Sequence, residues 1–259
     1  MSTFLFSDII FGPVKSRRFG VSLGINLLPC DRKLCSFNCI YCECGWTTKN
    51  SSKTGNGWVD ALTVETMLEE RLQEMKLRDE LPDTITFAGN GEPTLHPQFL
   101  PIMKATIALR GKYAPDAVVA VLSNASTAHR PDVFEALMLA DSHVMKLDTG
   151  TEETYKQINQ PASATPFAKI LSNLMLFNGD LTIQTMFLKG NHDGHAIDNT
   201  TEKEIKRWLD YLIQIKPQLV MIYSIARDTP AGDLMIVEKK QLNIIARQVE
   251  KAGIKAEVF

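Results

Sequence analysis

The stretch CSFNCIYC, residues 35–42, places three cysteines in one short loop and is the most informative part of the chain. All five cysteines lie between Cys30 and Cys44. A disulfide framework would spread its cysteines so that they join distant segments. Thiolates gathered in one loop instead indicate ligands around a single inorganic centre. Three of them can hold three irons of a [4Fe–4S] cluster, leaving the fourth iron open to a reactant.

A zinc site is the main alternative use of these cysteines. Structural zinc takes four ligands, commonly from paired CxxC motifs, and the loop has no second CxxC. Cys30 or Cys44 could complete a set of four. A free cysteine is more often a small buried apolar residue, and these two are too few to hold a second full cluster with thiolates alone.

Composition sets broad limits on the class of protein. The 259 residues carry 28 Lys plus Arg against 30 Asp plus Glu, a formal net charge of −2. The total charge therefore gives no drive toward nucleic acid, although Lys15, Arg17 and Arg18 form a local basic group. With 44% hydrophobic residues and no repeat or linker, a single domain over residues 1–259 is expected. The absence of a signal-like or membrane-spanning stretch predicts a cytoplasmic protein without membrane contact.

Strand-like apolar runs alternate with helical periodicity along most of the chain. Strands alternating with helices predict parallel βαβ units, and six such units predict an α/β fold with one curved sheet and helices outside it. Thr201 and Glu204 have the form of a capping box at the start of one helix. A polar loop is expected over residues 47–58. Strands are expected over residues 21–28, 84–88, 117–122, 144–147, 181–188, 218–225 and 254–259, and helices near residues 64–75, 98–109, 131–139, 167–177, 201–213 and 242–252.

Glycines and polar residues follow the second and third of these strands. The run GNGEP, residues 89–93, comes directly after the second strand. Glycines let a backbone approach a ligand closely, and the carboxylate of Glu92 can accept from an ammonium group. Alone the run is a turn signal, but one strand away from the cysteine loop it is a candidate binding loop. Ser123 and Asn124 follow the third strand, with helix capping as an equal alternative.

The cysteine loop, with Tyr41 before its last cysteine, and the glycine run together resemble the signature motifs of the radical S-adenosylmethionine (radical SAM) enzymes. The segments GPVKSRRFGVSLGINLLP, GNGEPTLHP and KLDTG extend the likeness to residues 11–227. They look like a subgroup of Fe–S oxidoreductases related to the wyosine tRNA-modifying enzymes. This resemblance implies a partial (β/α)6 barrel. Asn90 stands where the simplest GGEP pattern of the family has a glycine.

The resemblance also implies cofactors and ligands. In that family S-adenosylmethionine chelates the open iron of a [4Fe–4S] cluster, and an electron from the cluster releases a 5′-deoxyadenosyl radical that abstracts hydrogen from a substrate. The implied iron ligands are Cys35, Cys39 and Cys42, and the implied electron donor is a reductase such as a flavodoxin or ferredoxin. The candidate cofactor-binding residues are Tyr41, Gly89, Asn90, Gly91, Glu92, Ser123, Asn124, Asp148 and Gln184.

Further polar residues stand at the ends of the later strands, where barrels of this kind carry function. Lys146 and Asp148 close the fourth strand, and a charge that is buried there needs a partner. Gln184 lies within the fifth strand, facing either the interior or the helices. The run NHDGH, residues 191–195, follows it and could bind a metal or substrate. Arg227 could bind a phosphate or carboxylate, or pair with its neighbour Asp228.

The sequence therefore predicts a radical SAM enzyme whose substrate is unidentified, with a tRNA or nucleoside slightly preferred over a small metabolite. It lacks the second cysteine triad of the wyosine synthases, which argues against wyosine formation itself. A second reading is an activating or peptide-modifying enzyme that acts on a protein partner. A third is a non-catalytic zinc or Fe–S module that binds nucleic acid.

Overall fold

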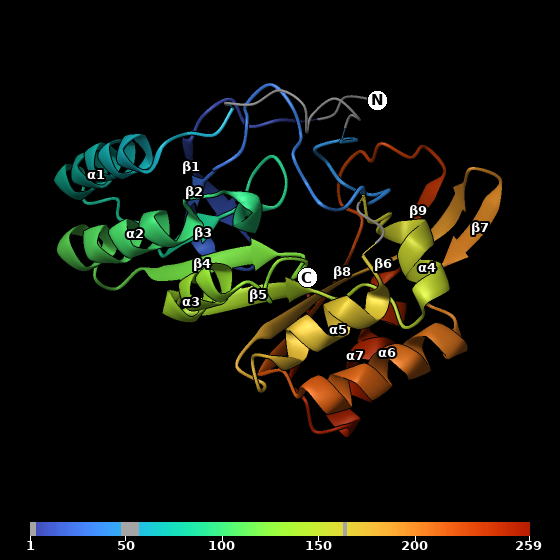
Figure 1. The fold of residues 1–259 in the computed structure, drawn as a ribbon. Helices are drawn as coiled ribbons and strands as arrows, with labels where there is room; N and C mark the ends of the chain where they lie inside the picture. Colours follow the sequence, from blue (N-terminus) through green and yellow to red (C-terminus); the bar gives the residue numbers. More distant parts are fainter. Residues whose placement is uncertain (1–3, 48–56, 163–164) are drawn as a thin grey trace.

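The computed structural model describes residues 4–47, 57–162 and 165–259; most of the expected loop over residues 47–58 lies outside these ranges. One curved sheet runs in the order β1-β2-β3-β4-β5-β6-β8-β10 (Figure 1), and β7 and β9 pair with β6. The strands are β1 (Ile10–Ser16), β2 (Gly20–Ile25), β3 (Thr84–Phe87), β4 (Val118–Ser123), β5 (Ser142–Lys146), β6 (Thr182–His192), β7 (His195–Asp198), β8 (Leu219–Ser224), β9 (Leu234–Ile236) and β10 (Ala256–Val258).

The pairing of the central strands confirms the predicted α/β fold. β2, β3, β4, β5, β6 and β8 pair side by side in parallel, and β10 adds in parallel to β8. Helices α1, α2 and α3 lie outside the first strands, and α5, α6 and α7 outside the last (Figure 1). The helices are α1 (Ala61–Leu77), the 3₁₀ turn η1 (Pro93–Leu95), α2 (Phe99–Tyr113), α3 (Pro131–Leu139), α4 (Glu152–Ile158), α5 (Phe167–Met175), α6 (Glu202–Ile215) and α7 (Lys239–Lys251).

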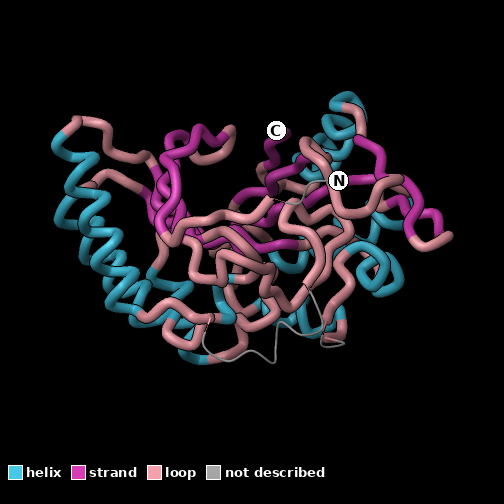
Figure 2. Tube along the Cα trace, turned by 90° about the horizontal axis from the view of Figure 1, so that it is seen from above, coloured by secondary structure: helices cyan, strands magenta, loops and turns pink. Residues whose placement is uncertain are grey.

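The carboxyl ends of the parallel strands meet at one end of this partial barrel. Figure 2 looks down on the molecule and shows loops crossing its middle, with helices around the periphery. Every residue of β3 is buried, as expected of a parallel strand that is covered on both faces. Among the described residues, none of the helices is both long and apolar enough to cross a membrane.

Two hairpins depart from the expected element pattern. β1 pairs antiparallel with β2, and its mostly exposed residues give no buried apolar run for a sequence pattern to detect. β6 continues past Leu188 to His192 and turns back through Asp193 and Gly194 into β7. Both turn residues have positive φ, 50° and 78°, which suits a tight hairpin turn. The expected loop over residues 191–195 is therefore the turn of a β-hairpin.

The start of α6 is also built differently from the expectation. Thr201 caps the helix by accepting from the backbone N–H of Glu204 at 3.3 Å, as a capping box requires. The Glu204 carboxylate does not turn back to the cap. It is buried and accepts from the backbone N–H of Gly150 at 2.7 Å and from the Thr154 hydroxyl at 2.9 Å. Glu204 thereby ties α6 to the chain that follows β5.

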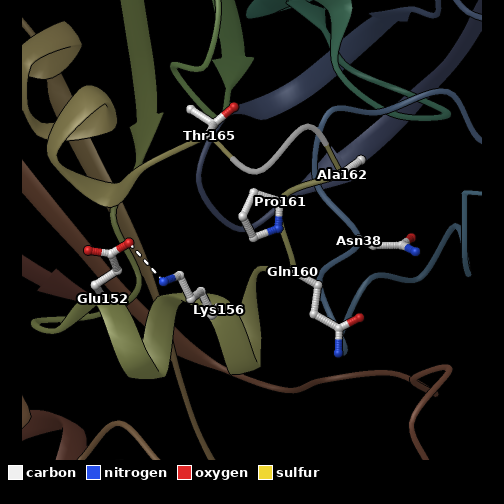
Figure 3. A pocket seen from close by; sticks show the side chains of 7 residues that line it. All are labelled: Asn38, Glu152, Lys156, Gln160, Pro161, Ala162 and Thr165. Carbon is white, nitrogen blue, oxygen red and sulfur yellow. Dashed lines mark ion pairs between the residues drawn. The ribbon is translucent and has the colours of Figure 1, made fainter.

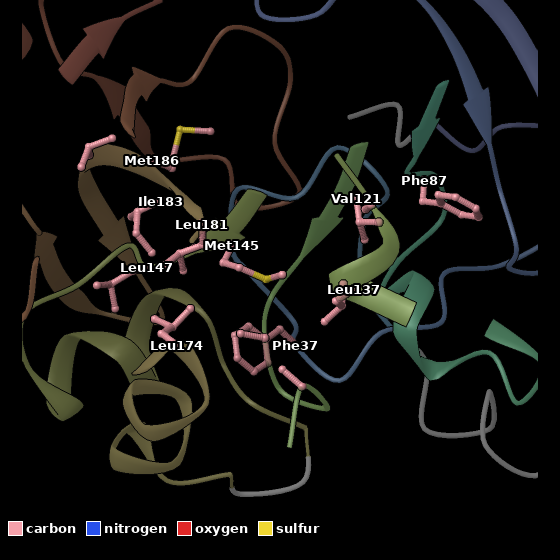
Figure 4. Packing of buried hydrophobic residues seen from close by; sticks show 14 of the residues in the cluster. Phe37, Phe87, Val121, Leu137, Met145, Leu147, Leu174, Leu181, Ile183 and Met186 are labelled. Carbon is pink, nitrogen blue, oxygen red and sulfur yellow. The ribbon is translucent and has the colours of Figure 1, made fainter. Parts of the chain in front are cut away.

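The hydrophobic core extends from the barrel into the cysteine loop. Phe37, between Cys35 and Cys39, is only 2% exposed. Figure 4 shows its ring among core side chains such as Met145 and Leu174. Burying a side chain of this size contributes about 1.5–3 kcal/mol. The loop is therefore anchored by packing as well as by its backbone.

Candidate functional site

Backbone pairing fixes the cysteine loop on two sides. On one side, Leu34 donates to the carbonyl of Asn90 at 2.9 Å and accepts from the N–H of Glu92 at 3.1 Å. On the other, Ile40 donates to the carbonyl of Ile158, at the end of α4, at 3.0 Å. The loop thus lies between the end of β3 and the end of α4. These contacts position its side chains without help from the thiols.

The three candidate iron ligands lie near a buried positive charge. Lys33 is 3% exposed and donates to the carbonyl of Gly45 at 2.9 Å. Burial opposes its charge, but the neighbouring thiols of Cys42, Cys35 and Cys39 raise its pKa. A buried lysine beside three thiols stabilises them as thiolates, which is the form that binds metal. This donor set fits a thiolate-bound cluster.

The individual thiols differ in their surroundings. Burial raises the pKa of Cys35 to about 12 and also raises that of Cys39, and Lys33 opposes both shifts. A hydrogen bond from the Cys44 thiol, with help from Lys33, lowers the pKa of Cys42 to about 5. Within the described residues, no three His, Cys, Asp or Glu side chains converge as a single metal ion would require. A cluster has a different requirement, because each thiolate binds its own iron.

Two side-chain amides donate to the sulfurs of the loop. The Nδ2 of Asn124 lies 3.6 Å from the Sγ of Cys35, and the Nδ2 of Asn159 lies 3.5 Å from the Sγ of Cys39. Asn124 follows β4 and Asn159 follows α4. Hydrogen bonds to cluster sulfurs are one of the means by which a protein sets the potential of a cluster.

The glycine run is pressed against the cysteine loop. A Cβ on Gly91 would lie 1.9 Å from the carbonyl oxygen of Leu34, and one on Gly89 would lie 2.4 Å from the Oδ1 of Asn26. Both glycines also have φ near +140°, which other residues rarely adopt. In addition, the Sγ of Cys44 lies 3.4 Å from the carbonyl oxygen of Gly89. The two candidate binding loops therefore form one unit.

Asn90, which replaces a glycine of the family pattern, has an internal role. Its side chain is fully buried, and its Nδ2 donates to the carbonyls of Phe6 and Pro29, both at 2.9 Å. Its Oδ1 accepts from the N–H of Phe6 at 2.8 Å. Asn90 thus holds the N-terminal segment and the approach to the cysteine loop against the glycine run.

Glu92 joins the glycine run to the loop after β4. Its Oε1 accepts from the hydroxyls of Ser123 at 2.8 Å and Thr94 at 2.5 Å, and its Oε2 accepts from the N–H of Asn124 at 2.7 Å. Burial raises the pKa of Glu92, although these hydrogen bonds oppose the shift. The structure therefore brings Glu92, Ser123 and Asn124 together, with the carboxylate already bound by groups of this chain.

A second buried network joins Tyr41 to the end of β5. The Tyr41 hydroxyl donates to the Oδ2 of Asp148 and accepts from the Nζ of Lys146 at 2.8 Å. The Nδ2 of Asn159 also donates to Asp148, at 2.7 Å, and so links this network to Cys39. Tyr41 and Asp148 are thus bound to each other and to the cluster loop.

Gln184 belongs to the same interior surface. It is buried in β6 and stands in register with Lys146 of β5 and Met221 of β8. In-register neighbours in a sheet project from the same face, and Lys146 points toward Tyr41 of the cysteine loop. This register resolves the earlier alternative, because Gln184 faces the interior and not the helices.

The remaining candidates have no contact with the thiols of Cys35, Cys39 and Cys42 among the described residues, although two of them touch the segment that follows Cys42. The His192 ring stacks on Trp46 at 5.6 Å, and the exposed His195 stands opposite His192 in the β6–β7 hairpin. Arg227 pairs with Glu43 at 2.6 Å and not with its neighbour Asp228. Cys30 is exposed, 3.8 Å from the Nδ2 of Asn26.

A separate hollow of about 450 Å³ adjoins the cysteine loop through Asn38. Figure 3 shows Glu152 and Lys156 along α4, joined by an ion pair of 3.0 Å. The other lining residues follow α4 in the chain. The full lining is Asn38, Glu152, Lys156, Gln160, Pro161, Ala162 and Thr165.

Sequence reasoning missed two polar residues of the site. Lys33 reads as one of several charges before the cysteines, and its burial depends on the packing of the loop. Asn159 ends α4, where an asparagine is an ordinary helix terminus. Only the pairing of α4 with the cysteine loop brings its amide to Cys39. No short sequence pattern carries that information.

Comparison with protein families gives a match over the region that contains this site. Residues 33–202 match the family model of the Radical SAM superfamily. The chain is 31% identical over 225 residues to a protein of Brachyspira hyodysenteriae named GTPase Obg, covering 85% of this chain and 30% of that protein. It is 33% identical over 213 residues to a UPF0026 protein of Methanocaldococcus jannaschii, covering 81% of this chain and 61% of that one. The chain thus spans less than two thirds of both relatives.

A further relative and two solved structures are also similar to this chain. A UPF0026 protein of Synechocystis is 32% identical over 228 residues, covering 85% of this chain and 77% of the relative. A radical SAM methyltransferase from Sphaerobacter thermophilus superposes with a TM-score of 0.64 at 13% identity, covering 92% of this chain and 65% of that one. Archaeal TYW1 superposes with a TM-score of 0.55 at 14% identity, covering 89% and 72%. At such identity the superpositions establish the fold.

Proposed function

Because this chain belongs to the radical SAM superfamily, whose enzymes use a [4Fe–4S] cluster and S-adenosylmethionine, we propose that it cleaves S-adenosylmethionine reductively and abstracts hydrogen from a substrate. When bound, the cluster and S-adenosylmethionine supply the electron and the 5′-deoxyadenosyl radical for that chemistry. The observation that carries the proposal is the set of three thiols around the buried Lys33, backed by the glycine run. Cys35, Cys39 and Cys42 would hold the cluster.

The remaining residues of the site position and shield these groups. Lys33 offsets thiolate charge inside the protein, where an unpaired charge is costly. Glu92 holds the loop after β4 against the glycine run, and we assign Gly89, Gly91, Ser123 and Asn124 to the wall that contacts S-adenosylmethionine. The network of Tyr41, Lys146 and Asp148 closes the opposite side.

The proposal extends to the substrate class and the partners. Membership in an enzyme superfamily argues against the non-catalytic module. We propose one catalytic domain with a small-molecule substrate and a flavodoxin or ferredoxin reductase as electron donor, acting in the cytoplasm. The formal net charge of −2 supports a metabolite over tRNA, because RNA binding draws mainly on contacts between cations and phosphates.

Anaerobic reconstitution tests the reaction. The protein would be loaded with iron and sulfide, reduced, mixed with S-adenosylmethionine and assayed for 5′-deoxyadenosine by mass spectrometry. We expect cluster-dependent product, together with a change in the EPR signal of the reduced cluster when S-adenosylmethionine is added. A loaded, reduced cluster that shows neither product nor EPR change would refute the proposal.

Single cysteine variants test the ligand assignment. Replacing Cys35, Cys39 or Cys42 with alanine should abolish 5′-deoxyadenosine formation, because each removes one iron ligand. Cys30→Ala is the matched control, since Cys30 is exposed and lies outside the assembly. Loss of the cluster in Cys30→Ala would show that the ligand set is wrong.

A further inference from the structure

Arg18 bridges the open side of the partial barrel. It lies in the turn between β1 and β2, and its Cζ is 5.1 Å from the centre of the Tyr223 ring in β8. The strands β3, β4, β5 and β6 separate β2 from β8 in the sheet. The contact therefore crosses the gap between opposite ends of the parallel sheet. The Ser16 hydroxyl fixes the turn by accepting from the N–H groups of Arg18 and Phe19, both at 3.2 Å.

The guanidinium of Arg18 has aromatic neighbours but no acceptor. Its Nη1 is buried, and no hydrogen bond or ion pair of the guanidinium is formed with the parts of the chain that the structure describes. Glu43, whose charge acts on Arg18, is already paired with Arg227 at 2.6 Å. Burial lowers the pKa of Arg18, yet an arginine keeps its charge at neutral pH. A half-buried cation whose buried Nη1 has no acceptor is costly unless an anion reaches it.

Tyr223 places this cation beside the candidate active site. Tyr223 is two residues beyond Met221 in β8, and Met221 is in register with the inward-facing Gln184. The alternation of side chains along a strand therefore turns Tyr223 toward the interior. Burial raises the pKa of Tyr223, and Lys146, Asp148, Arg18 and Cys39 also influence it. The interior surface thus continues from Arg18 through Tyr223 to the network beside Cys39.

We propose that Arg18 binds an oxyanion, a carboxylate or a phosphate, of a small-molecule substrate, with the Tyr223 ring holding the guanidinium in place. The planar fork of a guanidinium matches both groups and can bind either through two hydrogen bonds. Lys146 is not available for this role, because it is engaged with Tyr41 and Asp148. That the anion belongs to the substrate rests on the function proposed above.

A small molecule fits this site better than RNA does. A single recessed cation suits one anionic group, whereas RNA is held by several exposed cations along its backbone. The exposed cations of this segment are Lys15 and Arg17, which have the same charge as Arg18 but lie outside the gap. Arg17 therefore serves as a matched control for Arg18.

Calorimetric titration of the cluster-loaded, S-adenosylmethionine-bound protein tests the inference. Inorganic phosphate, pyrophosphate and malonate would be titrated at constant ionic strength into the wild type, Arg18→Gln, Arg18→Lys and Arg17→Gln. We expect saturable binding of at least one oxyanion to the wild type, about tenfold or more weaker in Arg18→Gln and partly retained in Arg18→Lys. Arg17→Gln should bind like the wild type. Preference for phosphates or for malonate identifies which oxyanion the substrate carries.

Several results would overturn the inference. The wild type could bind none of the three anions, or Arg17→Gln could weaken binding as much as Arg18→Gln does. A purely structural Arg18 would show itself if Arg18→Gln and Tyr223→Leu lowered the melting temperature equally and left oxyanion affinity unchanged. Oxyanion binding needs no turnover, so its failure alongside normal 5′-deoxyadenosine formation would count against Arg18 alone.

Discussion

Single amide groups at the sulfurs are expected to set the cluster potential. Asn159 donates to the Sγ of Cys39 at 3.5 Å, and such a bond favours the more negative, reduced cluster. Asn159→Ala should therefore make the midpoint potential about 20–60 mV more negative, the equivalent of one hydrogen bond. EPR-monitored redox titration would measure the shift. Asn243→Ala, on the exposed side of α7, is the control, and an unchanged potential in an Asn159→Ala protein with full cluster would contradict the assignment.

Glu92 is expected to act on both stability and cofactor binding. Its carboxylate accepts from Ser123, Thr94 and the backbone of Asn124. Glu92→Gln replaces one acceptor oxygen with a donor, which leaves a buried N–H facing another donor and costs about 1–3 kcal/mol. We expect a lower melting temperature and weaker S-adenosylmethionine binding, with the iron content nearly unchanged. The exposed Glu80→Gln is the control, and an unaltered affinity in Glu92→Gln would remove Glu92 from the cofactor site.

At the scale of elements, the bridge between Leu34 of the cysteine loop and Gly91 depends on the close approach of the two backbones. Gly91→Ala would put a Cβ 1.9 Å from the backbone of Leu34 at a φ of +144°, so the bridge between the two segments must open. We expect a large loss of stability and less iron bound per chain after reconstitution. Gly111→Ala is the matched control, because nothing lies within 4 Å of its new Cβ in α2. It should stabilise the protein by about 0.5–1 kcal/mol.

Chemical denaturation with iron analysis would distinguish these glycine variants. Gly91→Ala should unfold at lower urea concentration than the wild type, and Gly111→Ala at higher concentration. Normal stability and iron content in Gly91→Ala would show that the cysteine loop does not need this contact.

A hydrogen bond of His96, just before α2, to Val59, just before α1, should make the stability of the protein sensitive to acid. His96 donates through Nε2 to the carbonyl of Val59 at 2.8 Å, and its Nδ1 accepts from the N–H of Gln98 at 3.1 Å. Burial lowers the pKa of His96 below its usual 6.5, so the unfolded chain binds the proton more readily. The stability contributed by neutral His96 is therefore complete above pH 6.5 and falls as the pH drops below it.

Urea unfolding at pH 7.5 and 5.5 would measure this contribution. The free energy of unfolding should fall more between these pH values in the wild type than in His96→Gln, which cannot take up the proton. Burial also lowers the pKa of His129, so the comparison with the variant is what isolates His96. Equal losses in the two proteins would show that His96 has no part in the acid sensitivity.

At the scale of the whole molecule, the sequence predicted what depends on local pattern. Most of the parallel strands are recognisable because they are short apolar or β-rich runs, and the helix over residues 131–139 has its predicted bounds because Pro131 marks its first turn. β1 was missed because an exposed edge strand has no such run. The sequence predicts a loop in place of the β6–β7 hairpin because the turn carries polar residues that also suit loops.

The residues of the candidate site also fall into those that a short sequence motif predicts and those that only long-range contacts bring together. The cysteines and the glycine run form short motifs, so their positions could be predicted. Lys33 and Asn159 owe their places to contacts between segments far apart in the chain. Arg18 belongs to a basic group that the sequence shows, but its contact with Tyr223 arises only in the assembled barrel. Lysine and asparagine are common on protein surfaces, and only the assembled barrel makes Lys33 and Asn159 buried neighbours of the cysteines. Long-range packing thus accounts for most of what the sequence did not reveal.

The barrel is expected to fold without its cluster. The cysteine loop is paired by backbone to Asn90 and Ile158 and anchored by Phe37 in the core, and a chain of this size buries enough apolar surface to be stable without a metal. The triple variant with alanine at Cys35, Cys39 and Cys42 should keep the far-ultraviolet circular dichroism of the apo wild type and melt within about 3 °C of it, a difference of roughly 1 kcal/mol.

Fluorescence tests whether this folded state is one cooperative domain. With Trp46→Phe and Trp58→Phe added, the remaining Trp208, buried in α6, would report the core. Its unfolding curve in urea should coincide with that from circular dichroism, as a single cooperative unit requires. A triple-alanine variant that lost its near-ultraviolet signal and bound a hydrophobic dye would show that the thiols and their metal hold the fold. Coincident curves would leave the barrel as a preformed scaffold on which the cluster is assembled.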